Sequence, residues 1–138
     1  GVEFIEQPLA KDNWEGMKRL FEKSPLPLFA DESCVFEQDV EKCHGHFHGI
    51  NIKLTKCSGI TPAIRMIQKA RYLHMQVMMG SMNESSIGSA AIAHFLPQLD
   101  HADLDGPLLL AQDVAKGLDF DYGKVVVSGK PGLGISSL

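Results

Sequence analysis

Short apolar runs alternate with amphipathic segments along the chain, and this alternation limits the fold more than any other feature of the sequence. Strands that alternate with helices are typical of βαβ units, in which parallel strands form one sheet and helices cover it. The runs predicted as strands are residues 2–6, 28–31, 50–54, 76–81, 100–104 and 124–127, and the segments predicted as helices include 37–44 and 85–95.

Two of the predicted helices carry start signals. Asp12 is predicted as the N-cap of the first helix. Thr61 suits the N-cap of the helix that follows residues 50–54, and Pro62 suits its first position. Apolar residues recur at helical spacing in this second helix and are predicted to form its buried stripe: Ile60, Ile64, Ile67, Ala70 and Leu73.

A polar residue stands where each of the first five predicted strands meets the following loop. In a (β/α)8 barrel, side chains at this end of several strands form the active site. Five strands cannot close such a barrel, so about three further strands are expected upstream of Gly1. The polar residues, 22 to 28 positions apart, are Glu6, Asp31, Lys53, Ser81 and Asp103.

The residue types at the first three strand ends indicate one kind of chemistry. Glu6 and Asp31 are oxygen ligands on neighbouring strands, and oxygen ligands at a barrel mouth favour a hard cation such as Mg²⁺. A nearby cation disfavours the ammonium form of a lysine, so Lys53 on the next strand could act as a general base. A metal-bound carboxylate substrate could then lose its α-proton, with the metal stabilising the enediolate.

Lys56 is a rival to Lys53, and strand periodicity distinguishes them. Ile50 and Ile52 share one side of the strand, so Asn51 and Lys53 are predicted to point into the barrel. Lys56 has the opposite parity and follows the end of the strand, so it is predicted to be a solvated lysine.

Asp103 and Asp105 could form an acidic turn before Gly106, or a binding site. Residues at positions i and i+2 share a strand face, so both carboxylates could reach into the mouth together. Side by side they repel each other and favour a cation between them, such as an ammonium group. The pair is therefore predicted to bind the ammonium end of a substrate.

Five ordered motifs resemble the muconate-lactonizing-enzyme subgroup of the enolase superfamily, and within it the C-terminal half of a dipeptide epimerase. The resemblance covers almost the whole chain, and Pro131–Gly134 is similar to the tail of the same group. The motifs are Phe4-Ile5-Glu6-Gln7-Pro8, Ala30-Asp31-Glu32-Ser33, Asn51-Ile52-Lys53-Leu54, Gly80-Ser81-Met82 and Asp103-Leu104-Asp105-Gly106-Pro107.

The resemblance implies a role for each matching position. Glu6 and Asp31 match two metal-binding acids, and Lys53 matches the lysine that acts as acid or base on one face of the α-carbon. The remaining matches are substrate-binding positions: Ser81 and Asn83 line the pocket, and Asp103 and Asp105 bind the α-ammonium group. The first metal-binding aspartate and the opposing lysine pair belong to earlier strands, outside this sequence.

The sequence thus predicts an α/β fold, the C-terminal portion of a (β/α)8 (TIM-type) barrel of the enolase superfamily. Residues 1–107 would supply barrel strands 4 to 8, and residues 108–138 would return toward a separate N-terminal capping domain. The expected activity is Mg²⁺-dependent dipeptide epimerisation, although the chain alone should be inactive. The alternatives are a cycloisomerase, an o-succinylbenzoate synthase, an N-acyl amino acid racemase, or a non-catalytic fragment or scaffold.

Composition narrows the expected partners and surroundings. A formal net charge of -4 argues against a nucleic-acid or anionic-membrane surface, and the apolar runs are shorter than the roughly 20 residues that cross a bilayer. Cys34, Cys43 and Cys57 are an odd number without zinc-site spacing, which favours free thiols and a cytoplasmic location. A small dipeptide substrate and a homo-oligomeric state complete the expectations. The resemblance implies that much of the selection among dipeptides lies in loops of the capping domain, outside this sequence.

Overall fold

The computed structural model describes residues 1–137, which form two compact units. The first unit is Gly1–Met78, and the second begins at Met79. Strand β4, Gln76–Gly80, crosses the boundary between them.

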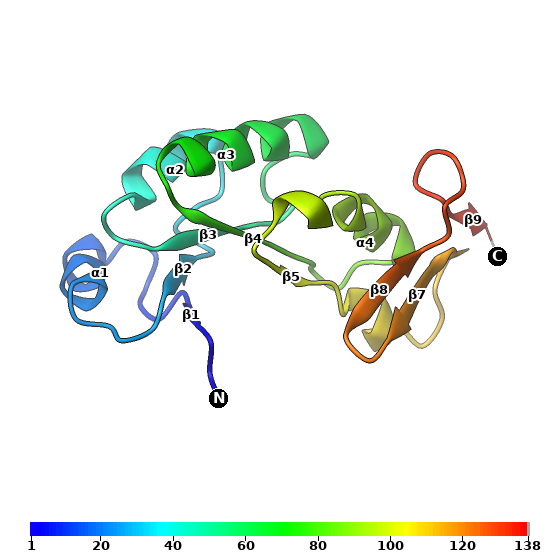
Figure 1. Ribbon diagram of the computed structural model, residues 1–138, viewed down its shortest axis with the longest axis horizontal. Coiled ribbons are helices and arrows are strands. Elements are labelled where there is room, and N and C mark those ends of the chain that lie inside the picture. The colour runs from blue at the N-terminus through cyan, green and yellow to red at the C-terminus, as the bar shows by residue number, and fades with distance from the viewer. Residues whose placement is uncertain (138) are drawn as a thin grey trace. The chain divides into compact units, whose positions relative to one another are not determined.

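The first unit is a parallel sheet with one helix after each of its first three strands (Figure 1). Its strands lie in the order β1-β2-β3, with the first residues of β4 next to β3. Glu6 of β1 pairs with Phe29 of β2, and Phe29 pairs in turn with Gly49 of β3. The elements are β1 Ile5–Glu6, α1 Trp14–Phe21, β2 Leu28–Ala30, α2 Glu37–Cys43, β3 Gly49–Ile52 and α3 Ile60–Tyr72.

The core of the first unit lies around β2 and β3, whose residues are all buried. Strands of a parallel sheet that is covered by helices are apolar on both faces, which explains the Leu-Phe-Ala run of β2. Gly49 is required in β3, since a Cβ there would lie 2.4 Å from the ring of Phe29. The absence of a side chain at this position therefore lets the Phe29 ring pack directly against the backbone of β3.

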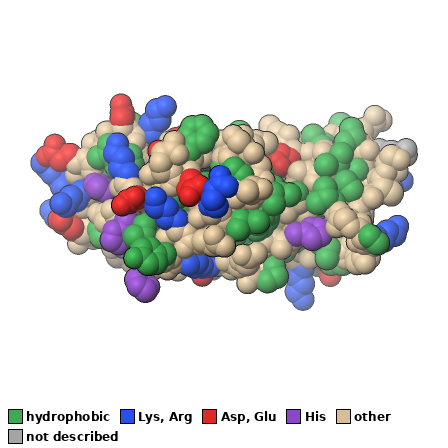
Figure 2. Space-filling view, turned by 90° about the horizontal axis from the view of Figure 1, so that it is seen from above, with side chains coloured by type: hydrophobic (Ala, Val, Ile, Leu, Met, Phe, Trp, Pro, Cys, Tyr) green, Lys and Arg blue, Asp and Glu red, His purple; other side chains and the backbone are tan. Residues whose placement is uncertain are grey.

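Helices α2 and α3 pack side by side, and ion pairs join their outer faces. Arg65 of α3 bonds Glu37 of α2 at 2.5 Å, and Lys69 bonds Glu41 at 3.2 Å. Figure 2 shows acidic and basic side chains interspersed on this face. Exposed pairs of this kind contribute little to stability, so the apolar contacts beneath them hold the helices in place.

The structure corrects the predicted starts of two helices. Asn13, not Asp12, caps α1, because its side-chain oxygen accepts from the amide of Gly16 at 3.0 Å. Helix α3 begins at Ile60 with Gly59 as its N-cap, two residues before the predicted Thr61 cap. The predicted stripe is also partly wrong, because Ile60 and Ile64 are exposed. The residues that α3 buries are Ala63, Met66, Ile67 and Ala70.

Up to Ser137, the second unit contains one α-helix, two 3-10 helices and short strands. The last residues of β4 lie next to β5, and the predicted strand at 124–127 is confirmed as part of an antiparallel hairpin, β7 with β8. Strand β6 pairs with β9, so the glycine-rich segment before β9 lies between two paired strands in the sequence. The elements are α4 Ser86–Ala93, η1 Leu96–Gln98, β5 His101–Asp103, η2 Gly106–Leu109, β6 Ala115–Lys116, β7 Leu118–Asp121, β8 Lys124–Val127 and β9 Ser136–Ser137.

Across residues 1–137, none of the helices combines the length and the apolar character that a membrane span requires.

Candidate active site

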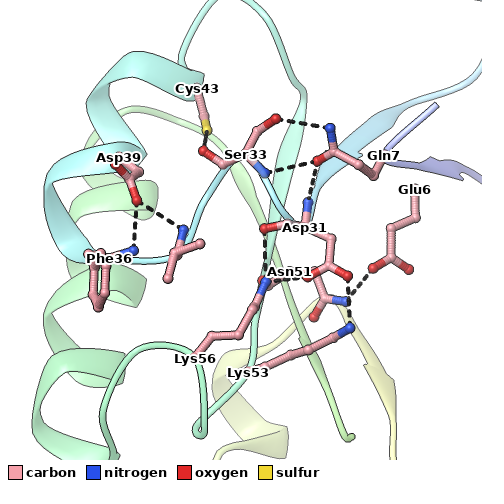
Figure 3. Close-up of polar contacts among 11 residues, drawn as sticks. Glu6, Gln7, Asp31, Ser33, Phe36, Asp39, Cys43, Asn51, Lys53 and Lys56 are labelled. Atoms are coloured by element: carbon pink, nitrogen blue, oxygen red, sulfur yellow. Dashed lines mark hydrogen bonds and ion pairs between the residues drawn. The ribbon is translucent and has the colours of Figure 1, made fainter. Parts of the chain in front are cut away.

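Polar side chains meet where the strands of the first unit end. Glu6 is the last residue of β1, Asp31 follows β2 directly, and Lys53 follows β3 directly. Parallel strands bring these ends to one edge of the sheet. Figure 3 shows Glu6, Asp31, Asn51 and Lys53 pointing toward one another. The structure therefore brings together the first three predicted site residues.

Asp31 is the centre of this group and is bonded by two lysines. Its carboxylate accepts from Lys53 Nζ at 2.8 Å through Oδ2 and from Lys56 Nζ through Oδ1. Only 6% of Asp31 is exposed, so burial alone would raise the pKa of its carboxyl group. The hydrogen bonds and charges of Lys53 and Lys56 outweigh burial and hold the pKa of Asp31 below its ordinary value.

Glu6 is in the opposite electrostatic position. Burial raises the pKa of its carboxyl group, and the neighbouring charge of Asp31 adds to this effect. A hydrogen bond from Asn51 Nδ2 at 2.6 Å and the charge of Lys53 only partly offset the rise. Two carboxylates in such proximity repel each other, so this edge of the sheet would be stabilised by additional positive charge.

The Lys53 side chain is set between these acids. Burial opposes its charged form, but the hydrogen bond from Lys53 to Asp31 and the charges of Asp31, Glu6 and Glu32 outweigh burial and raise its pKa. When no cation is bound to the acids, they thus hold Lys53 as an ammonium ion. A cation bound to Glu6 and Asp31 would remove this stabilisation and favour the neutral amine that a general base requires.

The prediction that Lys56 is solvated is wrong. Only 18% of its side chain is exposed. Besides the Asp31 carboxylate, its ammonium group donates to the main-chain oxygens of Asp31 at 2.8 Å and of Asn51 at 3.4 Å. A turn returns Lys56 to the strand end, because its amide bonds the carbonyl oxygen of Lys53 at 3.0 Å. Lys56 therefore links the ends of β2 and β3.

Gln7 fixes the backbone next to Asp31 and was not predicted as a site residue. Its Oε1 accepts from the amides of Asp31 at 3.0 Å and Ser33 at 3.1 Å. Its Nε2 donates to the hydroxyl of Ser33 at 2.9 Å and to the carbonyl of Leu9 at 2.9 Å. The sequence signal was its position next to Glu6 in the first motif. Gln7 thereby holds the start of the loop after β2 against the loop after β1.

The remaining predicted residues lie in the second unit, where Asp103 and Asp105 line one pocket of about 340 Å³. Both aspartates are exposed, and the other walls include Leu96, Phe120 and Val125. The shared strand face predicted for the pair is wrong, because β5 ends at Asp103 and Asp105 precedes the 3-10 helix η2. Both aspartates nevertheless line the same pocket as these apolar side chains.

Ser81 holds the turn that carries Asp105. Its amide donates to the carbonyl of Asp103 at 2.8 Å, and its hydroxyl accepts from the amide of Gly106 at 3.3 Å. Gly106 must be a glycine, because a Cβ there would lie 2.6 Å from the carbonyl oxygen of Met82. Asn83 is exposed in the loop after β4. Ser81 thus positions the aspartates, and its predicted role as a pocket residue stays a prediction.

The donor set of the first unit fits a hard cation in part. Glu6 and Asp31 offer carboxylate oxygens, and Mg²⁺ is commonly bound through one or two carboxylates together with water and substrate oxygens. Among residues 1–137, no group of three or more His, Cys, Asp and Glu side chains is placed to hold a metal ion. The two acids would therefore supply part of a coordination shell.

Comparison with known proteins agrees with the predicted family. The family model described as Enolase C-terminal domain-like matches residues 1–137. An L-Ala-D/L-amino acid epimerase of Flavobacterium johnsoniae is 54% identical over 138 residues, which are 100% of this chain and 41% of that protein. The chain thus spans about 40% of the length of the curated relatives it matches.

Two solved structures are similar to the chain over nearly its whole length. The substrate-liganded L-Ala-D/L-Glu epimerase from Bacillus subtilis matches with a TM-score of 0.92 and 34% identity, over 99% of this chain and 40% of that one. A dipeptide epimerase from Cytophaga hutchinsonii, complexed with Mg and D-Ala-L-Val, matches with a TM-score of 0.92 and 28% identity, over 100% and 39%. The predicted fold class, the C-terminal portion of an enolase-superfamily barrel, is confirmed.

Proposed function

The chain belongs to the Enolase C-terminal domain-like family, and from this premise we propose that the whole protein is a Mg²⁺-dependent dipeptide epimerase. The reaction would invert the α-carbon next to the carboxylate of a dipeptide by 1,1-proton transfer. The names of its relatives, an L-Ala-D/L-amino acid epimerase and L-Ala-D/L-Glu epimerases among them, support this substrate class. Those names belong to proteins of which this chain matches about 40%.

The observation that carries the proposal is the contact of Lys53 with Asp31 beside Glu6. An ammonium group lies 2.8 Å from one of the two acids that would hold the metal ion, so base and metal site are adjacent. A proton acceptor and a cation must both be close to a carbon acid, because the carbanion is too basic to form without charge stabilisation. A lysine that lies away from the metal-binding acids would not meet this requirement.

In this reaction, two acids of this chain would bind the metal ion and one lysine would transfer the proton. Glu6 and Asp31 would hold Mg²⁺, which would neutralise the substrate carboxylate and the negative charge that develops as the α-proton leaves. Lys53 would remove or return that proton on one face of the α-carbon. Inversion also requires an acid or base on the other face, which in this proposal lies outside the chain. The Lys53 amine takes up one proton in one direction and releases it in the other, so the reaction needs no redox partner.

Asp103 and Asp105 would bind the substrate's α-ammonium group. Charge-assisted hydrogen bonds to a carboxylate are stronger than neutral ones and select for a cationic group. The apolar wall formed by Leu96, Phe120 and Val125 would receive the nearby hydrocarbon. A substrate that lacks a free ammonium group could not make these charge-assisted hydrogen bonds. The pocket therefore favours dipeptides over the N-acylated amino acids and dicarboxylates of the alternative activities.

A screen of the whole protein against a library of dipeptides tests the proposal. Epimerisation is followed by chiral chromatography, with Mg²⁺ and then with excess EDTA, and N-acetylated copies of the best substrates serve as matched controls. We expect inversion of free dipeptides that requires Mg²⁺ and is lost on acetylation. Inversion of the acetylated compounds alone would support an N-acyl amino acid racemase instead, and activity that persists in EDTA would contradict the metal site.

A further inference from the structure

Asn51 is the most unusual polar side chain in the first unit. It is 1% exposed and lies in β3, in the middle of the sheet, where apolar residues are the rule. Within residues 1–137, Asn51 Oδ1 and Ser89 Oγ are the buried side-chain oxygens that have no hydrogen-bond partner. A buried acceptor without a partner destabilises the folded state. Asn51 thus lowers the stability of the sheet, and we look for its role in function.

The orientation of the Asn51 amide is fixed by its neighbour. Its Nδ2 donates to Glu6 Oε1 at 2.6 Å. The opposite orientation would place the amide oxygen against a carboxylate oxygen at the same distance, and two acceptors at that distance repel each other. The amide must therefore turn its nitrogen toward Glu6, which leaves Oδ1 on the side that lacks a partner. Figure 3 shows this bond reaching from β3 to the end of β1.

The bond has a consequence for the other carboxylate oxygen of Glu6. Glu6 is the last residue of a strand only two residues long, and it is partly exposed, so its side chain has little packing to restrain it. One hydrogen bond to Oε1 restricts rotation of the carboxylate and leaves Oε2 for another ligand. Asn51 is itself held by the buried strand, and it is not free to move with Glu6.

We propose that Asn51 is a positioning residue, whose side chain holds one oxygen of Glu6 so that the other is presented to the divalent cation. The inference rests on the proposed function, because it presumes a cation at Glu6 and Asp31. This arrangement leaves Oδ1 without a partner, which lowers the stability of the folded state. Replacing the whole amide by an apolar group of similar size should therefore leave the fold intact while it weakens the metal site.

Calorimetric titration of the whole protein with Mg²⁺ alone, without substrate, tests the proposal. Asn51→Leu should weaken Mg²⁺ binding about tenfold, the low end of the effect found when groups that orient a metal ligand are removed. Its thermal midpoint, measured in EDTA, should be no lower than that of the unmodified protein, because the unpaired oxygen is gone. Asn51→Val gives a second, smaller apolar variant should leucine disturb the sheet.

Ser89→Ala is the matched control, because Ser89 Oγ is the other unpaired buried oxygen and lies in α4 of the second unit. This variant should also keep its thermal midpoint, but its Mg²⁺ affinity should be unchanged. A loss of affinity in both variants would indicate a general effect of altering the core and would overturn the role of Asn51.

A double-mutant cycle with Glu6→Gln separates positioning from a structural role. If Asn51 acts through Glu6, then Mg²⁺ affinity in the double variant should equal that of Glu6→Gln alone. Additive losses, an unchanged affinity in Asn51→Leu, or a thermal midpoint lowered in both Asn51→Leu and Asn51→Val would each overturn the proposal. If Glu6→Gln itself leaves Mg²⁺ affinity unchanged, the proposed metal site is wrong, and the role of Asn51 falls with it.

Discussion

Charged side chains are held differently at the strand ends of the first unit and in the pocket of the second. In the first unit, buried Asp31 bonds two ammonium groups, and Asn51 bonds Glu6 from within the sheet. In the second, Asp103 and Asp105 are exposed and line a pocket whose other walls are largely apolar. Fixed charges suit the making and breaking of bonds, whereas exposed acids beside an apolar wall suit recognition of a substrate's end.

The two units should therefore respond differently to substitution. Changes at the strand ends should alter turnover, metal binding and stability, because the side chains there depend on one another. Changes in the aspartate pocket should alter substrate affinity and little else. These responses are expected of the whole protein.

The largest effect expected from the pocket is that of Asp103→Asn. The substitution keeps the shape of the side chain but removes the charge that would bind the ammonium group, so KM for a dipeptide should rise about ten- to hundredfold. Steady-state kinetics should show kcat close to that of the unmodified protein. Asp121→Asn, on an exposed residue of β7, serves as the control and should change neither constant. A fall in kcat at constant KM would remove the contrast between the two regions.

A smaller but measurable effect is expected on stability from Lys56→Met in the first unit. The variant removes the ammonium group that bonds Asp31 and two main-chain oxygens, so the free energy of unfolding should fall by about 1 to 3 kcal/mol. Urea unfolding measures this change. Lys69→Met provides the comparison, because its ion pair with Glu41 is exposed and should contribute only about 0 to 1 kcal/mol. If the free energy of unfolding falls equally in the two variants, Lys56 contributes no more to stability than an exposed lysine.

The smallest effect is expected on the pH dependence of stability, and it arises from His48 at the opposite end of these strands. Burial lowers the pKa of His48, whose Nδ1 accepts from the amide of Leu28 at 3.0 Å. The unfolded chain then binds the proton more readily than the folded one. The contribution of His48 to stability is therefore present above its ordinary pKa of 6.5 and is lost as pH falls below it.

His48→Gln should flatten this response, because glutamine retains an acceptor but does not titrate. Thermal midpoints measured between pH 7.5 and pH 5 at constant ionic strength check the expectation, and the fall on acidification should be smaller in the variant. Equal slopes in both proteins would show that the acid response of the first unit arises elsewhere, for example at the strand-end acids.

Strand periodicity predicted the first unit well where side chains lie within or directly after a strand. Asn51 and Lys53 were assigned to the inner side of β3 because their parity is opposite to that of Ile50 and Ile52, and both contact the acids of the site. Parity could not place Lys56, since the chain turns after Lys53 and a period of two no longer applies. The same limit explains Asp105, which follows the end of β5.

Helix α3 shows a second limit of the sequence. Two apolar stripes fit its helical spacing and share Ile67 and Ala70, so spacing alone does not decide which faces the sheet. The structure buries the stripe that contains Ala63 and Met66 and leaves Ile60 and Ile64 exposed. A small residue at 63 allows close approach to the strands, which a search for large apolar residues does not detect.

The most direct test of the central claim, that Lys53 exchanges a proton beside the metal ligands Glu6 and Asp31, is hydrogen exchange in deuterated water. Each epimer of a dipeptide substrate is incubated separately with Lys53→Met and Mg²⁺, and deuterium at the α-carbon is measured by NMR. Exchange should fall about 10²- to 10⁴-fold from one epimer while the other still exchanges. Equal residual exchange from both epimers would contradict the account.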